Sequence, residues 1–238
     1  MNDRTARPDP LQPQRLPGDI ERASLAIIDA EVPEPRPFAD GKWEVVRRMI
    51  HATADFALLT LVRFHARAMD AALAALAAGA VIVTDTQMAR MGIPERRLTP
   101  LGCQAVCLLD DPRTSQMARE EAKTRTAAAV DLAVELSGGP GIVPGRPDAP
   151  VIFVIGNAPT ALLRLLEHMR QGSIRPALVA GMPVGFVNAA QSKALLSQYG
   201  ETAQGAPYLT ILGRKGGSTS AAAAINALLE LVLRERAG

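Results

Sequence analysis

The sequence predicts an α/β protein with a doubly wound, mostly parallel sheet and helices on both faces, in a three-layer α/β/α arrangement. Short apolar runs alternate with longer segments of helical periodicity along most of the chain. The short runs are apolar throughout instead of alternating with polar residues, which is typical of strands buried on both faces. Hydrophobic residues make up 48% of the 238 residues, which is enough for a sizeable core.

The alternation gives the order of the elements. The expected strands cover residues 57–62, 81–84, 104–108, 151–155, 177–180 and 208–212. The expected helices cover residues 20–31, 43–52, 67–78, 86–91, 116–136, 158–171, 187–198 and 217–235. A Gly/Pro-rich stretch at 137–150 interrupts the pattern, which then resumes, so a surface loop is favoured over a linker between domains. We expect residues 20–238 to form a single domain.

The N-terminal segment 1–19 contains charged residues and prolines but no apolar h-region, which indicates a disordered Pro-rich leader and not a signal peptide. The apolar run 71–83 is too short to span a bilayer, so no membrane association is expected. Cys103 and Cys107 lie four apart in an expected strand, where their side chains are too distant to bridge. Reduced thiols in a cytoplasmic protein are the simplest interpretation.

The charge balance and the aromatic content exclude one large class of partners. Lys and Arg number 26 against 24 Asp and Glu, and aromatic residues make up only 3%. A platform that stacks bases needs a basic face with interleaved aromatic residues, and a net charge of +2 gives no polyelectrolyte signature, so no nucleic-acid partner is expected. A large ligand must be held by aliphatic walls and a few polar groups.

Glycine-rich turns follow three of the expected strands, at the edge where parallel sheets bind ligands. They cover residues 156–160, 181–186 and 213–218. In the last, Gly216 and Gly217 allow close backbone approach, Arg214 and Lys215 add positive charge, and Ser218 opens a helix. This pattern favours an oxyanion ligand, although each loop alone is equally consistent with a tight turn. Neither a Walker loop nor a GxGxxG fingerprint is present.

His51 is the best candidate for proton transfer among the three histidines. It ends an amphipathic helix, with Arg47 and Arg48 one turn earlier and Asp55 four residues later, and imidazole exchanges protons near neutral pH. The other two, at 65 and 168, are interpreted as structural. No serine lies in a GxSxG elbow and no ligand set has metal spacing, so neither a hydrolase triad nor a metal is expected.

Two further charged residues have both a structural and a functional interpretation. Asp85 closes a strand, where it can cap the next helix or meet a ligand. Arg125 lies within an expected helix, as a solvated charge or as a clamp for a carboxylate.

Together these motifs resemble one family, the precorrin-8X methylmutases of cobalamin biosynthesis. The resemblance covers residues 20–229 and depends on the order and spacing of the motifs. They are ERASLAIIDAE, VVRRMIHATADF, VTDTQMARMGI, DDPRT, KTRTAAA, IGNAPTALL, GMPVGFVNAAQSK and GRKGGSTSAAAAINALL.

The resemblance implies an isomerase that moves a methyl group from C-11 to C-12 in ring C of a corrinoid tetrapyrrole. The product is hydrogenobyrinate from precorrin-8X, or cobyrinate from the cobalt-containing substrate. It also implies that no cofactor is used, that the protein is a homodimer with active sites near the interface, and that His51 donates the proton. The residues expected to bind substrate are Ser24, Asp85, Arg125, Asn157, Lys193, Arg214, Lys215, Gly216, Gly217 and Ser218.

Two other functions remain open from the sequence. One is a corrinoid-binding protein without activity. The other is an α/β transferase that uses a nucleotide or S-adenosylmethionine, which the missing GxGxxG disfavours.

Overall fold

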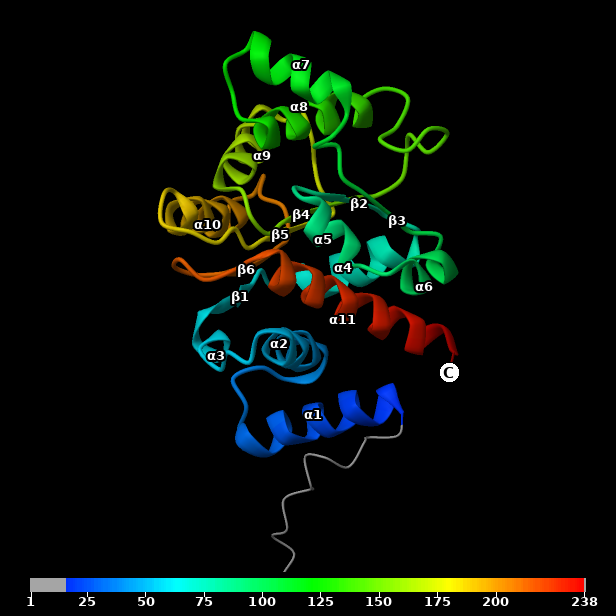
Figure 1. The fold of residues 1–238 in the computed structure, drawn as a ribbon, viewed down its shortest axis with the longest axis vertical. Helices are drawn as coiled ribbons and strands as arrows, with labels where there is room; N and C mark the ends of the chain where they lie inside the picture. Colours follow the sequence, from blue (N-terminus) through cyan, green and yellow to red (C-terminus); the bar gives the residue numbers. More distant parts are fainter. Residues whose placement is uncertain (1–15, 238) are drawn as a thin grey trace, which may run out of the picture.

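A computed structural model describes residues 16–237, which fold around one six-stranded sheet (Figure 1). The strands lie in the order β1-β6-β5-β4-β2-β3. Strands β2 to β6 run parallel to one another, and β1 pairs antiparallel with β6 at one edge. Their bounds are β1 Val62–Phe64, β2 Val81–Thr84, β3 Gln104–Val106, β4 Val151–Ile155, β5 Leu178–Gly181 and β6 Tyr208–Ile211.

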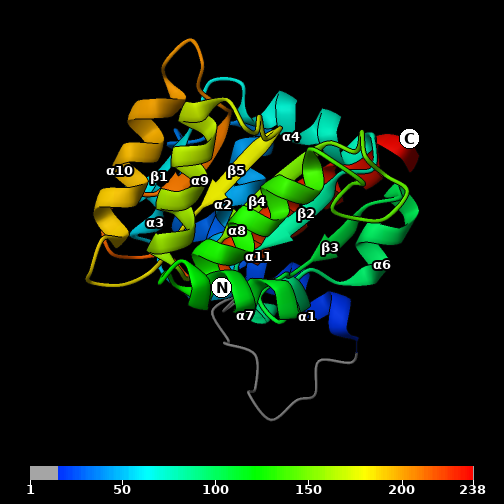
Figure 2. The same cartoon turned by 90° about the horizontal axis from the view of Figure 1, so that it is seen from above.

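Helices cover both faces of the sheet, which confirms the three-layer prediction. The helices α2, α4 and α11 pack on one face and α8, α9 and α10 on the other (Figures 1 and 2), while α1 packs outside α2. The helices are α1 Pro17–Glu31, α2 Asp40–Thr53, α3 Leu58–Leu61, α4 Ala68–Ala77, α5 Gln87–Met91, α6 Glu95–Leu98, α7 Pro112–Glu120, α8 Arg125–Ser137, α9 Pro159–Gln171, α10 Ala189–Gly200 and α11 Ser218–Ala237, with a 3-10 turn at Thr99–Leu101.

The apolar strands are buried on both faces because alternate side chains enter different cores. In β2, Val81 and Val83 pack with α8 and α9, while Ile82 packs with α2, α4 and α11. In β4, Phe153 and Ile152 divide between the two cores in the same way. A sheet with helices on only one face would instead carry polar side chains on its other, solvated face.

The predicted strand at 57–62 is wrong. The Asp55 carboxylate accepts a hydrogen bond from the amide of Ala57 at 3.0 Å, and this turn leads into the short helix α3. The strand begins only at Val62 and runs antiparallel to β6. Apolar periodicity alone does not separate a buried strand from a single buried helical turn.

The predicted helix at 116–136 is also wrong, because it is two helices. Ala122 adopts a left-handed conformation with φ 49°, and the Thr124 hydroxyl caps α8 by accepting from the amide of Ala127 at 3.3 Å. A left-handed residue cannot continue a right-handed helix, so α7 ends before it. The sequence pattern also missed α6 and the 3-10 turn after it.

Helix α1 begins at Pro17, so residues 17–19 belong to this helix and not to the predicted leader. Residues 1–15 of that leader lie outside the described part of the chain. Among residues 16–237, no helix combines the length and the apolar character needed to cross a membrane. Cys103 and Cys107 are both free thiols, as predicted.

Candidate functional site

The three glycine-rich loops interlock at the carboxyl edge of the sheet. A side chain on Gly156 would place its Cβ 2.6 Å from Cα of Ser218, and one on Gly216 would place its Cβ 2.1 Å from the carbonyl oxygen of Met182. The amide of Gly217 donates to that same carbonyl at 2.9 Å. The loops after β4, β5 and β6 are therefore one packed unit, and glycine is required where the backbones touch.

Asp85, directly after β2, holds the loop after β4 in place through hydrogen bonds. Its carboxylate is buried, 5% exposed, and accepts hydrogen bonds from the amides of Gly156, Asn157 and Ala158 at 3.0, 2.8 and 2.7 Å. Burial raises the pKa of Asp85, and the three amide donors act against that rise. The Asp85 carboxylate thus binds the loop after β4, and the cap of the helix that follows Asp85 comes from Thr86 instead.

Lys193 on α10 lies inside the protein and is not open to a ligand, contrary to the expectation that it binds substrate. Its side chain is completely buried, and Nζ donates to the backbone carbonyl of Lys215 at 2.5 Å. Burial lowers the pKa of the Lys193 ammonium to about 8. The side chain of Lys193 therefore contacts the loop that precedes α11.

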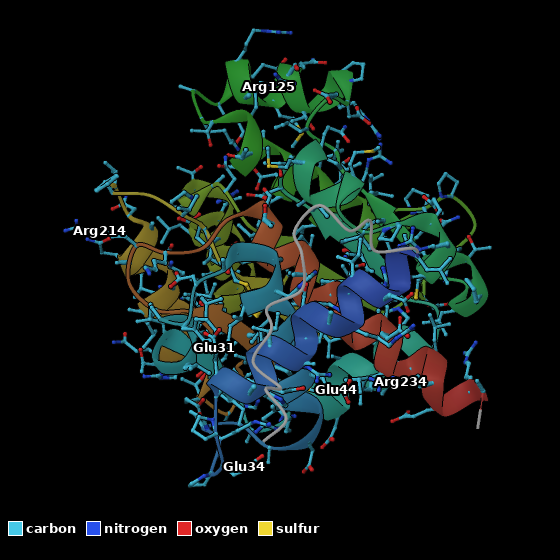
Figure 3. The ribbon with its side chains drawn as sticks, turned by 60° about the horizontal axis from the view of Figure 1, so that its bottom comes forward. Glu31, Glu34, Glu44, Arg125, Arg214 and Arg234 are labelled. Carbon is cyan, nitrogen blue, oxygen red and sulfur yellow. The ribbon has the colours of Figure 1, made fainter. Side chains whose placement is uncertain are left out.

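The cations of that loop point outward. Nζ of Lys215 pairs with the Asp55 carboxylate at 2.7 Å, and this hydrogen bond lowers the pKa of Asp55. The guanidinium of Arg214 lies 5.3 Å from the ring centre of Phe186, and Figure 3 shows Arg214 at the margin of the molecule. The Lys215–Asp55 pair joins the loop to the segment that follows α2.

His51 lines a hollow of about 330 Å³ beside this unit. Its exposed ring lies in the last turn of α2, and Arg48 lies one turn earlier. Ser218, at the start of α11, lines the same hollow, and its hydroxyl lies 3.0 Å from that of Thr86. The other lining residues are Ala52, Met88, Gly92, Thr219, Ala222, Ala223 and Asn226. The hollow thus combines an accessible imidazole, hydroxyl groups and small apolar walls.

The small side chains of α11 make this arrangement possible. Residues Ala221 to Ala224 are all buried, and α11 packs closely along α2. Gly92 lies so close that a Cβ there would be 2.8 Å from Cβ of Ala222. Short side chains let helices approach, which brings the end of α2 next to the start of α11.

The predicted site residues fall into separate groups. His51 and Ser218 share the hollow, and residues 214–217 and Asn157 lie on the adjoining loops. Ser24 lies on α1, one turn after Glu21, whose carboxylate accepts from Arg48 at 2.6 Å. Burial acts to raise the pKa of Glu21, but Arg48 outweighs it and the pKa is lowered.

Arg125 is not among the residues that line the His51 hollow. It is the first residue of α8, and its guanidinium donates to the carbonyl of Leu109 at 2.6 Å and to Asp110 at 3.1 Å. Asp110 also accepts from the side-chain amide of Gln87 at 3.0 Å, and Gln87 precedes Met88, which lines the hollow. Arg125 is therefore connected through Asp110 to α5, the helix that carries Met88 at the hollow.

Sequence reasoning missed Met88, Thr219 and Asn226 as lining residues of the hollow. One face of α11 lines the hollow, with residues at helical spacing: Thr219, Ala222 or Ala223, and Asn226. This spacing identifies the face only when the position of the neighbouring helix is known. No group of three or more His, Cys, Asp or Glu residues that could hold a metal occurs between residues 16 and 237.

Comparison with known proteins places this arrangement in one family. The model of the precorrin-8X methylmutase family matches residues 19–231. The chain is 42% identical over 217 residues to the cobalt-precorrin-8 methylmutase of Salmonella typhimurium, covering 90% of this chain and 94% of that one. It is 41% identical over 209 residues to the precorrin-8X methylmutase of a Sinorhizobium species, covering 88% and 92%.

A solved structure agrees with the same assignment. The crystal structure of precorrin-8X methylmutase from Thermus thermophilus superposes with a TM-score of 0.78 at 43% identity, covering 92% of this chain and 97% of that chain. The sheet, its helices and the sequence similarity therefore extend together over nearly the whole described region. The chain belongs to the precorrin-8X methylmutase family of isomerases.

Proposed function

We propose that the protein catalyses methyl migration from C-11 to C-12 of a corrinoid tetrapyrrole, with His51 as the proton donor. The exposure of this imidazole in a hollow beside a cationic, glycine-rich loop is the observation that carries the proposal. His65 is buried and His168 is mostly enclosed, so neither is as accessible to a substrate. The reaction belongs to cobalamin biosynthesis in the cytoplasm.

The chemistry requires little beyond positioning and one proton. The methyl group moves within one molecule, so no leaving group has to be captured and no nucleophile has to attack. Protonation or hydrogen bonding of a ring nitrogen by His51 favours the migrated product. The cations of Arg214 and Lys215, on the loop before α11, suit the acidic arms of the substrate.

We further propose that the protein acts as a homodimer whose second copy covers the apolar side chains near the hollow. Met88 and Met91 on α5 are each 70% exposed, and Phe186 and Val187 in the loop after β5 are 83% and 78% exposed. Exposed apolar side chains gathered near a site favour a protein partner. A Met88→Lys and Met91→Lys double variant is expected to shift the protein to monomer in sedimentation; an unchanged dimer would refute this interface.

The function is tested by replacing His51 with Ala and following the absorbance of purified protein mixed with precorrin-8X or with its cobalt-containing analogue. We expect turnover to fall by at least about 100-fold, since general acid catalysis typically contributes that much. Binding of hydrogenobyrinate should persist. Thr53→Ala, an exposed substitution two residues away, is the matched control. Unchanged turnover in His51→Ala would contradict the proposed role.

The same assay separates the alternatives. A corrinoid-binding protein without activity would bind the substrate and leave its absorbance unchanged. A transferase would bind S-adenosylmethionine or a nucleotide, which calorimetry would detect as heat. Running the metal-free and the cobalt-containing substrates side by side identifies the preferred one.

A further inference from the structure

Two lysines of this protein are enclosed in very different surroundings. Lys123 contacts the carboxylates of Asp131 and Glu121, the latter at 2.6 Å. Lys193 is completely buried, and its ammonium donates to the backbone carbonyl of Lys215. Within residues 16–237, no carboxylate lies within ion-pair distance of the Lys193 ammonium. Lys193 is thus a buried charge whose partner is a loop backbone.

Such a burial is unfavourable for folding by itself. An ammonium loses its hydration inside the protein, and one carbonyl does not replace it. The lowering of the Lys193 pKa to about 8 by burial has the same cause. A methionine has a similar length and carries no such penalty. The presence of a charge at this position therefore needs an explanation other than stability.

The carbonyl that Lys193 holds lies in a backbone with unusual conformations. Gly213, Gly216 and Gly217 have φ values of 74°, 154° and 129°, a region that only glycine enters readily. Lys215 lies between them, and its side chain pairs with Asp55 outside while its carbonyl is held by Lys193 inside. Chain segments with such freedom open easily unless specific contacts fix them.

We propose that Lys193 is a positioning residue that fixes the loop at 213–217 from inside, so that the cationic side chains of the loop face the ligand. The ammonium acts through the Lys215 carbonyl and does not touch the substrate. Only the identity of that ligand rests on the proposed function; the fixing of the loop does not.

The test compares Lys193→Met and Lys193→Gln with Lys123→Met, a matched removal of an enclosed lysine elsewhere. Hydrogen exchange of the amides at 213–218 should be about tenfold faster or more in Lys193→Met, as expected from the loss of a hydrogen bond to a charged group. In the corrinoid assay, KM should rise about tenfold while kcat changes much less. The Lys193→Gln variant, which keeps an N–H donor, should lie between wild type and Lys193→Met.

Lys123→Met should give the opposite pattern, with lower stability but unchanged exchange at 213–218 and unchanged KM. Wild-type exchange rates in Lys193→Met would overturn the proposal, as would loss of folding in both Lys193 variants, which would make the residue structural. If the wild-type protein turned over no corrinoid, the proposed function would fail, and the exchange comparison would still decide the role of Lys193.

Discussion

Replacing Lys193 with Met should change how the stability of the protein depends on pH. The side chain is buried and its pKa is lowered to about 8, from 10.5 in an ordinary lysine. Between these two pH values the unfolded chain holds the proton and the folded chain has released it. Because the unfolded state binds more protons there, the contribution of Lys193 to the free energy of unfolding rises with pH.

The size of the effect follows from the same two values. Each pH interval of one contributes about 1.4 kcal/mol, so the rise from pH 8 to pH 10.5 amounts to about 3 kcal/mol. Below pH 8 the wild-type protein carries the full penalty. The hydrogen bond from the ammonium to the Lys215 carbonyl opposes the loss of the proton, so this figure is a ceiling.

Urea unfolding of wild type and Lys193→Met at pH 7, 8, 9 and 10 measures this dependence. Other lysines and tyrosines titrate in both proteins and cancel in the difference. We expect the wild type to gain stability relative to the variant as pH rises, by at most about 2.5 kcal/mol over this range. A difference that does not change with pH would show that burial does not penalise the Lys193 ammonium and would refute the reasoning.

Three other predictions concern stability and the loops. Asp85→Ala leaves buried amides without an acceptor and should lower the free energy of unfolding, measured in urea, by about 2–5 kcal/mol. A loss below about 1 kcal/mol would show that these hydrogen bonds do not stabilise the loop. Burial acts to raise the pKa of Asp131, but the hydrogen bonds from its cationic partners outweigh burial and lower this pKa. The contribution of the Asp131 carboxylate to the free energy of unfolding should therefore be present at neutral pH and disappear on acidification below about pH 4. Asp131→Asn should remove that acid dependence, as followed by thermal unfolding. In Gly216→Ala the added Cβ would collide with the Met182 carbonyl, so this variant should not bind corrinoid. In Gly213→Ala the added Cβ meets nothing within 4 Å, so this variant should lose only about 1 kcal/mol in the free energy of unfolding and still bind. Equal effects of the two substitutions would exclude the close contact as the cause.

The parallel sheet was predictable because its strands carry apolar residues on both faces, a signal that Ile82 and its neighbours give locally. The edge strand β1 was not, because the turn at Asp55 and the pairing with β6 depend on contacts distant in the sequence. The motif around His51 predicted a proton-transfer residue; the structure places this residue, exposed, at the hollow, and its role stays a prediction. The roles of Asp85 and Lys193 required knowledge of burial, since each binds backbone atoms of a segment remote in sequence.

The contact of Gly156 with Ser218 and of Gly216 with Met182 has a consequence for how this site can change over time. Segments that touch through their backbones cannot vary one at a time, because any side chain added to one must displace another. Substitutions in these three loops should therefore combine non-additively in double-mutant cycles. Substitutions that allow a new ligand to bind are therefore expected at exposed positions of these loops, such as Phe186 and Arg214. The residues whose backbones touch are expected to stay unchanged.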